Sequence, residues 1–454
     1  MKDYRSYFRD DTICALITPP GIGGVAIVRV SGQNAKQIVK PIFSKDPFGM
    51  NSHTVHFGKI RSFASSELID EGLCLYMQGP HSFTGEDVIE LQFHGGNLIA
   101  QKVIESLIQS GATLALPGEF SFRAYRSGKI DLLQAKGIQE MISARNEKSL
   151  KAAQSHLEGK LSKHLHSIKA QLLELAAVLE AWVDFPEEGL EFMSFDEMVT
   201  KLECENQKIK YLIDSFKTGH MLFSGATLCL VGEPNVGKSS LMNALLGKSR
   251  AIVTPIAGTT RDVIEEDLKL FDLTIRIKDT AGIRDTDEVI EQEGIRRSLS
   301  AIDEADVVLF VKDATKPLSE KERDIYSRLQ PSKTIFIANK IDEGLYEEDT
   351  RFYKVSAKYE TGIDELKAHI YERLLSKGLE GKEDLLIMDE SQKEALVNVH
   401  NLLHKVICGL KKDLSCEFIV IDLKEALKVL ASLVGIDVTE DVLTALFSKF
   451  CVGK

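Results

Sequence analysis

The middle of the chain alternates short apolar runs with segments of helical spacing. Between residues 226 and 380 the apolar runs read TLCLVG, LTIRIKD, DVVLFVKD, KTIFIANK and FYKVSA. Nearly continuous apolar runs of this length are typical of parallel strands buried on both faces. Because helical segments separate them, the pattern predicts a doubly wound α/β domain, in which helices cover both faces of a parallel sheet.

The segments on either side of this domain have a helical period. Apolar residues three and four positions apart lie on one face of a helix. One such stripe precedes the α/β domain and two follow it: Leu165, Ile168, Leu172, Leu175, Leu179 and Trp182; Leu396, Val399, Leu403, Val406 and Leu410; Leu423, Leu427, Leu430 and Val434. The simplest architecture is an all-α domain of residues 127–222 and 383–454, split by an inserted α/β domain of residues 223–382.

Residues 1–126 have a mixed pattern that predicts an α+β domain. A helix is expected over residues 97–111, closed by its final glycine. The glycines of PPGIGG fit neither the dinucleotide fingerprint nor a P-loop, so we interpret this segment as a plain turn. Three segments are predicted strands: GVAIVRVSG (24–32), GLCLYM (72–77) and DVIELQF (87–93).

Composition and charge narrow the class of protein. With 454 residues, 44% hydrophobic and 27% charged, the chain is an ordinary globular protein of several domains. A net charge of −12 argues against a nonspecific nucleic-acid binder and leads us to expect no DNA partner, although it allows a local basic face. The seven cysteines include no C-x-x-C pair. The first residues lack the apolar core of a signal peptide. No apolar run approaches the ~20 residues of a membrane span. We therefore expect a cytoplasmic protein that does not enter a membrane.

The segment GEPNVGKS (232–239) matches the P-loop pattern G-x-x-x-x-G-K-[ST], between a predicted strand and a predicted helix. In such a loop, backbone N–H groups point at the β-phosphate and the helix N-terminus adds partial positive charge. Lys238 is expected to reach the β- and γ-phosphate oxygens, and Ser239 to bind Mg²⁺. The predicted nucleotide contacts in this loop are Asn235, Val236, Gly237, Lys238, Ser239 and Ser240.

Three further loops follow in the order expected of a GTP-binding domain. In TPIAGTTRD (254–262) Thr260 is placed to bind Mg²⁺, and in IKDTAG (277–282) Asp279 can hold Mg²⁺ through water while the Gly282 N–H meets the γ-phosphate. In NKID (339–342) the Asp342 carboxylate can accept hydrogen bonds from guanine N1–H and its amino group, which adenine does not offer. The other predicted GTP contacts in these loops and in SAK (356–358) are Thr254, Pro255, Ile256, Ala257, Gly258, Thr259, Thr280, Ala281, Asn339, Lys340, Ile341, Ser356, Ala357 and Lys358.

The residue after Gly282 departs from a common GTPase pattern. Many GTPases place a glutamine there to orient the attacking water, but this chain has Ile283, which cannot hydrogen-bond to water. The sequence also shows no arginine finger. Hydrolysis must therefore use another polar residue and another positive charge.

The chain resembles the MnmE (TrmE) family of bacterial tRNA-modification GTPases over nearly its whole length. The resemblance rests on the GTP motifs and on DTICALITPPGIGGVAIVRVSG near the start, HSFTGEDVIELQFHGG (81–96), LPGEFSFRAYRSGKIDLLQA (116–135) and the closing FCVGK. It implies an N-terminal domain that dimerises and binds a folate, a split helical domain and an inserted G domain. It also implies that a homodimer works with an FAD-containing partner of the MnmG type. Together they would add an aminomethyl or carboxymethylaminomethyl group to C5 of the wobble uridine of certain tRNAs, from a 5-formyl or methylene tetrahydrofolate.

The resemblance also bears on the missing glutamine. Members of this family are activated when two G domains meet across the dimer, with K⁺ near the phosphates, where a cation can neutralise the charge of the transition state. The implied K⁺ ligands are Asn235, Thr254, Thr259 and the carbonyl of Ile256, and Glu291 is implied to position the attacking water.

Four further residues match family positions for folate and one-carbon chemistry. Arg29, Glu90 and Lys129 match folate ligands, and Cys451 is implied to act near that pocket, with a nucleophilic role as a hypothesis. One alternative is a GTPase switch that regulates ribosome assembly without joining any modification chemistry. A second alternative, an ATP-driven module, is disfavoured by NKID.

Overall fold

The computed structural model forms two compact units. The residues that it describes are 7–144, 146–184, 193–247, 265–271, 273–279, 302, 305–346, 350–375, 385–412 and 414–453. The first unit comprises Met1–Gln139, His156–Glu205 and Asn401–Lys454, and the second comprises Glu140–Ser155 and Asn206–His400. The domain boundaries expected at residues 126, 222 and 382 stay predictions.

The N-terminal part of the first unit is a six-stranded sheet with the order β3-β4-β5-β2-β1-β6. Its neighbouring strands are antiparallel except for β1 with β6. The three predicted strands are confirmed as β2, β4 and β5, whereas the other three were not predicted. The strands are β1 (Ile13–Leu16), β2 (Ala26–Ser31), β3 (Thr54–Arg61), β4 (Leu68–Met77), β5 (Val88–Phe93) and β6 (Thr113–Leu114).

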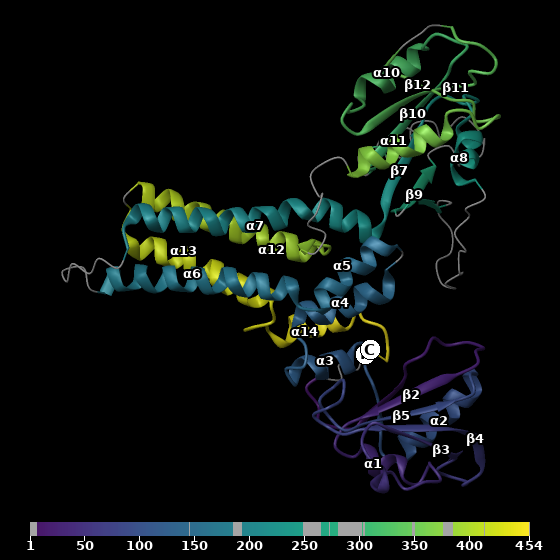
Figure 1. Ribbon diagram of the computed structural model, residues 1–454, viewed down its shortest axis with the longest axis vertical. Coiled ribbons are helices and arrows are strands. Elements are labelled where there is room, and N and C mark those ends of the chain that lie inside the picture. Colours follow the sequence, from purple (N-terminus) through teal and green to yellow (C-terminus); the bar gives the residue numbers. More distant parts are fainter. Residues whose placement is uncertain are drawn as a thin grey trace, which may run out of the picture. The chain divides into compact units, whose positions relative to one another are not determined.

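Two helices, α1 (Ala35–Val39) and α2 (Asn97–Gln109), share a buried core with this sheet (Figure 1). Val28 and Val30 of β2 pack there with Val103 of α2. Because side chains alternate along a strand, the residue between the two valines, Arg29, points to the opposite face. The sheet therefore has a buried face and a face that presents polar groups.

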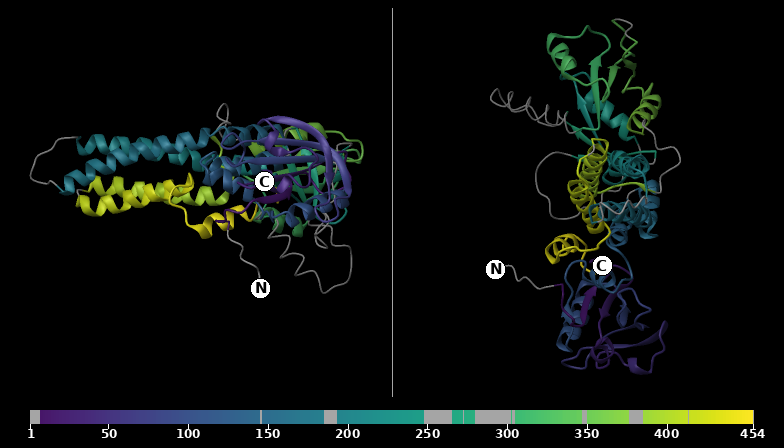
Figure 2. Two further views of the ribbon diagram at one scale, coloured as in Figure 1. Left: turned by 90° about the horizontal axis from the view of Figure 1, so that it is seen from below. Right: turned by 90° about the vertical axis from the view of Figure 1, so that its left-hand side faces the viewer.

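The helices of the first unit bury the predicted apolar stripes. Helices α6 (Lys160–Asp184) and α13 (Cys416–Leu433) lie side by side, as Figures 1 and 2 show. Leu165, Leu172 and Leu179 of α6 and Leu423 of α13 are buried, which confirms the period read from the sequence. Shorter helices in or entering this unit are α3 (Glu119–Arg126), α4 (Leu132–Ser143), α5 (Glu147–Leu157) and α14 (Glu440–Phe447), with a short 3₁₀ helix at Pro47–Gly49.

The second unit contains the predicted α/β domain. Its sheet has the order β12-β11-β10-β7-β9-β8, parallel throughout except that β8 is antiparallel to β9. All five predicted strands are present. The strands are β7 (Ala226–Val231), β8 (Glu265–Leu270), β9 (Leu273–Asp279), β10 (Val307–Asp313), β11 (Thr334–Asn339) and β12 (Tyr353–Lys354).

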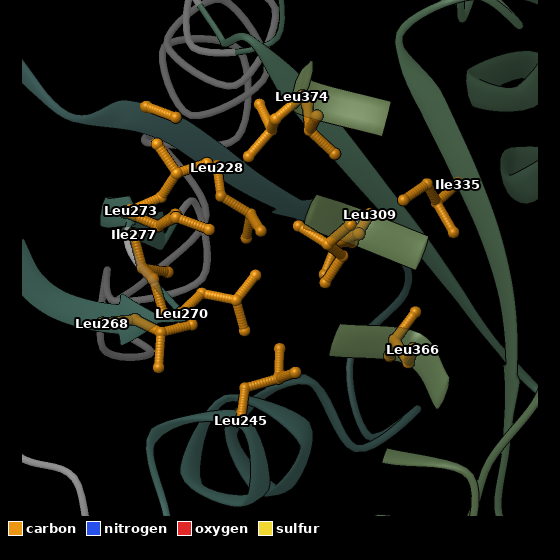
Figure 3. Close-up of a cluster of buried hydrophobic side chains, with 14 of the residues drawn as sticks. Leu228, Leu245, Leu268, Leu270, Leu273, Ile277, Leu309, Ile335, Leu366 and Leu374 are labelled. Carbon is orange, nitrogen blue, oxygen red and sulfur yellow. The ribbon is translucent and has the colours of Figure 1, made fainter. Parts of the chain in front are cut away.

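Helices cover both faces of this sheet. Leu228 and Leu309 point toward α8 (Lys238–Leu246) and α11 (Ile363–Leu375), as Figure 3 shows. The alternate residues, such as Cys229 and Phe310, belong to a second core with α10 (Glu320–Arg328). Both faces are thus apolar, which accounts for the continuous apolar runs in the sequence.

Two long helices, α7 (Phe195–Ser224) and α12 (Glu390–Lys411), continue from one unit into the other. Within the second unit, the Ser215 hydroxyl accepts a hydrogen bond from the backbone of Ile387 at 3.1 Å.

Across the described ranges, no helix has both the length and the apolar character that a membrane span needs.

Candidate functional site

The carboxyl ends of β9, β7, β10 and β11 meet at one edge of the second sheet. Asp279 is the last residue of β9 and pairs in register with Leu230 of β7, while Asp313 of β10 pairs with Asn339 of β11. Ligands of open α/β sheets bind outside this edge. The topology therefore gathers three of the predicted GTP motifs in one place.

The P-loop turns from β7 into α8 as predicted. Gly237 caps α8 in a left-handed conformation with φ +93, and a Cβ at this position would collide with the side-chain amide of Asn339. Only glycine therefore fits here. The Lys238 ammonium donates hydrogen bonds of 2.8 Å to the carbonyls of Gly232 and Glu233, so it lies over the loop. Ser239 and Ser240 are exposed at the helix N-terminus, where backbone N–H groups attract phosphate.

Asn339 joins two of the predicted motifs. Its side-chain nitrogen donates to the Val236 carbonyl of the P-loop at 3.0 Å, and its side-chain oxygen accepts from the Ala357 N–H at 3.0 Å. Asn339 is buried, and both bonds are therefore shielded from water. Its role in this structure is to hold the phosphate loop and the SAK loop together.

The Asp342 carboxylate, which the sequence predicts to recognise guanine, is held in place by the same SAK loop. The Ser356 hydroxyl donates a hydrogen bond of 2.6 Å to one Asp342 oxygen, Oδ1. This hydrogen bond does not involve Oδ2. The backbone of Ile341 is fixed by a 3.3 Å hydrogen bond to the Val355 carbonyl.

The sequence reasoning missed a second carboxylate, Asp313. Its Oδ2 accepts a 2.8 Å hydrogen bond from the Lys340 ammonium, and its Oδ1 accepts from the backbone and hydroxyl of Thr315 at 3.0 and 2.6 Å. Burial alone would raise the Asp313 pKa, but the bonds from Lys340 and Thr315 outweigh it and hold the pKa at about 2. The signal was present in the sequence, because Asp313 ends a buried parallel strand and so had to lie at the site edge.

A side-chain contact from α10 fixes the start of the P-loop. Ser319 caps α10 through a capping box with Glu322, and its hydroxyl also donates a hydrogen bond of 2.5 Å to Glu233. The P-loop is therefore tied to the helix that follows β10. No sequence pattern indicates the contact between Glu233 and Ser319, because the two residues are far apart in the chain.

A separate, largely buried polar site lies on the face of the N-terminal sheet opposite α1 and α2. Arg29 and Glu90 are register partners on β2 and β5, and the Arg29 guanidinium donates to Glu90 Oε1 at 2.8 and 2.9 Å. The guanidinium also lies over the rings of Phe83 and Phe120, 5.4 and 5.5 Å from their centroids. Both contacts fix its orientation.

Lys129 lies near the loop that carries Phe83 and Gly85. It is exposed, and its Cγ would lie 3.8 Å from a Cβ on Gly85, two residues after Phe83. The predicted pair Arg29 and Glu90 is thus in direct contact, while Lys129 approaches their neighbourhood through residues 83–85.

The C-terminal tail packs onto the N-terminal domain within the first unit. The rings of Phe447 on α14 and Phe122 on α3 lie 5.4 Å apart. The Gly118 N–H donates a hydrogen bond of 3.1 Å to the Cys451 carbonyl, and Gly453 is buried against Leu16. In every view of Figures 1 and 2 the labelled C-terminus lies beside the N-terminal sheet. The Cys451 thiol itself is exposed.

Comparison with known proteins finds relatives along nearly the whole chain. The family model for the MnmE helical domain matches residues 132–451, and the model for the GTP-binding protein TrmE N-terminus matches residues 12–129. The tRNA modification GTPase MnmE of Protochlamydia amoebophila (strain UWE25) is 47% identical to this chain, with 99% of each covered. The chain belongs to the MnmE family of tRNA modification GTPases. The MnmE of Aquifex aeolicus (strain VF5) is 39% identical, with 98% of this chain and 100% of that protein covered.

Several residues predicted from the MnmE and GTP motifs lie outside the described part of the chain, and for Asp279 only the backbone is described. Those outside are Thr254, Pro255, Ile256, Ala257, Gly258, Thr259, Thr260, Thr280, Ala281, Gly282 and Glu291. Their roles stay predictions. Asn235 is described, exposed, and in a left-handed conformation with φ +66.

The PPGIGG segment of this MnmE-family chain forms bends and a turn-like loop, and it also lines a cavity of ≈ 290 Å³. Residues 95–97 at the start of α2 line the other side, and the Asn97 side chain accepts a hydrogen bond of 2.8 Å from the Gly21 N–H. The lining residues carry no charged side chain.

Proposed function

We propose that this protein is a K⁺-dependent GTPase that helps to modify C5 of the wobble uridine of certain tRNAs in the cytoplasm, with a tetrahydrofolate as one-carbon donor. One observation carries the proposal beyond the family assignment. The short helix α3 and the residue before it connect the tail with the Arg29 site: Gly118 binds the Cys451 backbone, and Phe120 lies under the Arg29 guanidinium. Residues 118–120 therefore contact both the backbone of Cys451 and the guanidinium of Arg29, which supports a folate site near the tail.

The Arg29 site has the chemistry that a folate needs. The hydrogen bond and the ion pair of Arg29 both use Oε1 of Glu90, which leaves Oε2 to accept from the amino-pyrimidine edge of a pterin. The exposed ammonium of Lys129 suits an anionic tail or a formyl oxygen. A bound tetrahydrofolate would supply the one-carbon unit. The protein would bind and orient this folate, and Cys451 would act near the site.

The nucleotide site supports hydrolysis without a glutamine. The exposed Asn235 side chain lies in the P-loop, and with Thr254, Thr259 and the Ile256 carbonyl it would hold K⁺. These are neutral oxygen ligands, which suit a large monovalent cation. Mg²⁺ would be held by Ser239 and Thr260, and Glu291 would position the attacking water.

The N-terminal sheet also offers a surface for a homodimer. Phe57 of the edge strand β3 is 59% exposed and pairs in register with Leu73 of β4, while Val55 is 54% exposed and pairs with Leu75. These four residues form an apolar patch on the face that also carries Glu90, and Leu75 of β4 is the register partner of Glu90 on β5. Exposed patches of this kind mark interaction surfaces. We assign this patch to a second copy of the chain, and the hetero-oligomer with an MnmG-type FAD protein would form on that dimer.

Mass analysis of nucleosides from the tRNA of cells that lack this protein tests the proposal. We expect the C5 substituent of the wobble uridine to be absent, and to return with the wild-type gene. The competing role, a regulatory switch in ribosome assembly, predicts unchanged wobble nucleosides with altered ribosomal subunits. Binding of 5-formyltetrahydrofolate to the full chain, lost on Glu90→Gln, supports the first role and is not expected of the second.

A further inference from the structure

We infer that Asp313 is a positioning residue for guanine nucleotides, which acts by anchoring the ammonium of Lys340 so that the methylene stem of that lysine forms a wall of the base pocket. The inference concerns nucleotide binding alone and does not depend on the tRNA chemistry.

The two Asp313 oxygens have separate partners. Oδ1 is held by the backbone and hydroxyl of Thr315, two residues along the chain, and this fixes the carboxylate plane. Oδ2 accepts from the Lys340 ammonium at 2.8 Å. The Asp313 side chain is only 10% exposed, so water competes little for this ion pair. The carboxylate is therefore fixed before the lysine binds to it.

Lys340 stands between the two guanine-site residues, Asn339 and Asp342. Its backbone is left-handed, with φ +69, which is costly for a residue with a long side chain. A lysine in water would direct its ammonium to solvent and let the stem move freely. Here the backbone fixes one end of the side chain and the ion pair with Asp313 fixes the other, so the apolar stem that we place beside the base has little entropy left to lose on binding.

The register of β10 with β11 explains why Asp313 can reach Lys340. Asp313 is the direct parallel neighbour of Asn339, and the next residue, Ala314, donates its N–H to the Asn339 carbonyl at 2.8 Å. The anchor is therefore one strand away from the motif it supports. It belongs to no nucleotide motif of the sequence.

A double-mutant cycle with Lys340→Met tests the inference. Methionine keeps an apolar stem but has no charge to anchor, so the effect of Asp313→Asn should depend on which residue occupies position 340. In the wild-type background we expect Asp313→Asn to weaken GDP binding in the presence of Mg²⁺ about tenfold, by calorimetry on the full chain. In the Lys340→Met background we expect a change of less than about twofold.

Asp324→Asn is the matched control, because Asp324 forms a 2.9 Å ion pair with Arg328 on the exposed surface of α10. It should leave GDP affinity unchanged. Steady-state kinetics add a second readout, since an anchor for binding should raise the KM for GTP and leave kcat nearly unchanged. Equal weakening in both backgrounds would mean that Asp313 acts independently of Lys340, and no weakening in either would mean that it does not position the nucleotide. Either result overturns the inference.

Discussion

The Ser356 hydroxyl donates a 2.6 Å hydrogen bond to Oδ1 of Asp342 and thereby fixes the carboxylate that is to read guanine. Asp342→Asn replaces an acceptor with an amide that donates. We expect GTP affinity to fall about a hundredfold or more, because guanine N1–H and its amino group then face a donor. Xanthosine triphosphate, which has a carbonyl in place of the amino group, should bind the variant better than GTP does. Competition binding with the two nucleotides measures this change.

The Ser356 contact gives that experiment its control. Ser356→Ala removes the hydrogen bond that orients the carboxylate but leaves the acceptor, so it should weaken GTP without favouring xanthosine triphosphate. A variant Asp342→Asn that still prefers GTP would show that another group reads the base.

Attachment of the tail depends on the space at Gly118. Gly118 has φ +68, and a Cβ there would lie 2.6 Å from the Phe447 carbonyl oxygen and 2.9 Å from the Phe450 Cβ. Gly118→Ala should therefore detach or displace the tail and destabilise the first unit by about 1–3 kcal/mol. We expect wobble modification to be lost while GTP hydrolysis continues, as measured by nucleoside analysis and phosphate release.

Gly128→Ala is the control for Gly118→Ala, because it introduces the same backbone strain without a steric clash. Gly128 has a nearly equal φ of +70 but nothing within 4 Å of a Cβ. It should show only the strain of a left-handed alanine, about 1 kcal/mol in thermal unfolding, with modification retained. If the two alanine variants modify tRNA equally well, the tail contact is not needed for activity.

Phe57 is predicted to lie in the homodimer interface. Phe57→Asp puts a charge into the apolar patch and should leave a folded monomer, as light scattering after gel filtration would show. Lys59, two residues along the same strand and exposed, provides the control, because Lys59→Asp changes charge on the strand outside the patch. A Phe57→Asp protein that is still dimeric would place the interface elsewhere.

Much of the nucleotide site could be predicted because its residues are local in sequence. The P-loop and NKID each follow a buried strand and SAK follows the edge strand β12, and a parallel sheet brings such strand ends to one edge whatever the loops between them. The contacts that were missed join distant residues: Asp313 with Lys340, and Glu233 with Ser319. Neither pair has a spacing that a sequence pattern could record.

The N-terminal domain was harder to predict for a different reason. Strand β3 shows Val55 and Phe57 on its open face, with Gly58 and Ile60 inside, so its alternation does not follow the usual apolar-in, polar-out rule. Strands β1 and β6 are short, and β6 contains only two residues. Arg29 and Glu90 each look ordinary in sequence, and only the register of β2 with β5 joins them.

Dependence on K⁺ is the sharpest test of the catalytic proposal, because a cation held by Asn235 of the P-loop is proposed to supply the positive charge for hydrolysis. At equal ionic strength and saturating GTP, we expect turnover in KCl to exceed turnover in NaCl by at least about tenfold, since a cation at the phosphates replaces a missing arginine finger. Asn235→Gly should abolish this difference, because glycine keeps the left-handed conformation at φ +66 but lacks the side-chain oxygen. GDP affinity should be unchanged in the same variant, which separates loss of the cation from damage to the loop. Equal rates of the wild-type protein in the two salts would exclude the cation from catalysis, and full K⁺ stimulation of Asn235→Gly would remove Asn235 from its ligands.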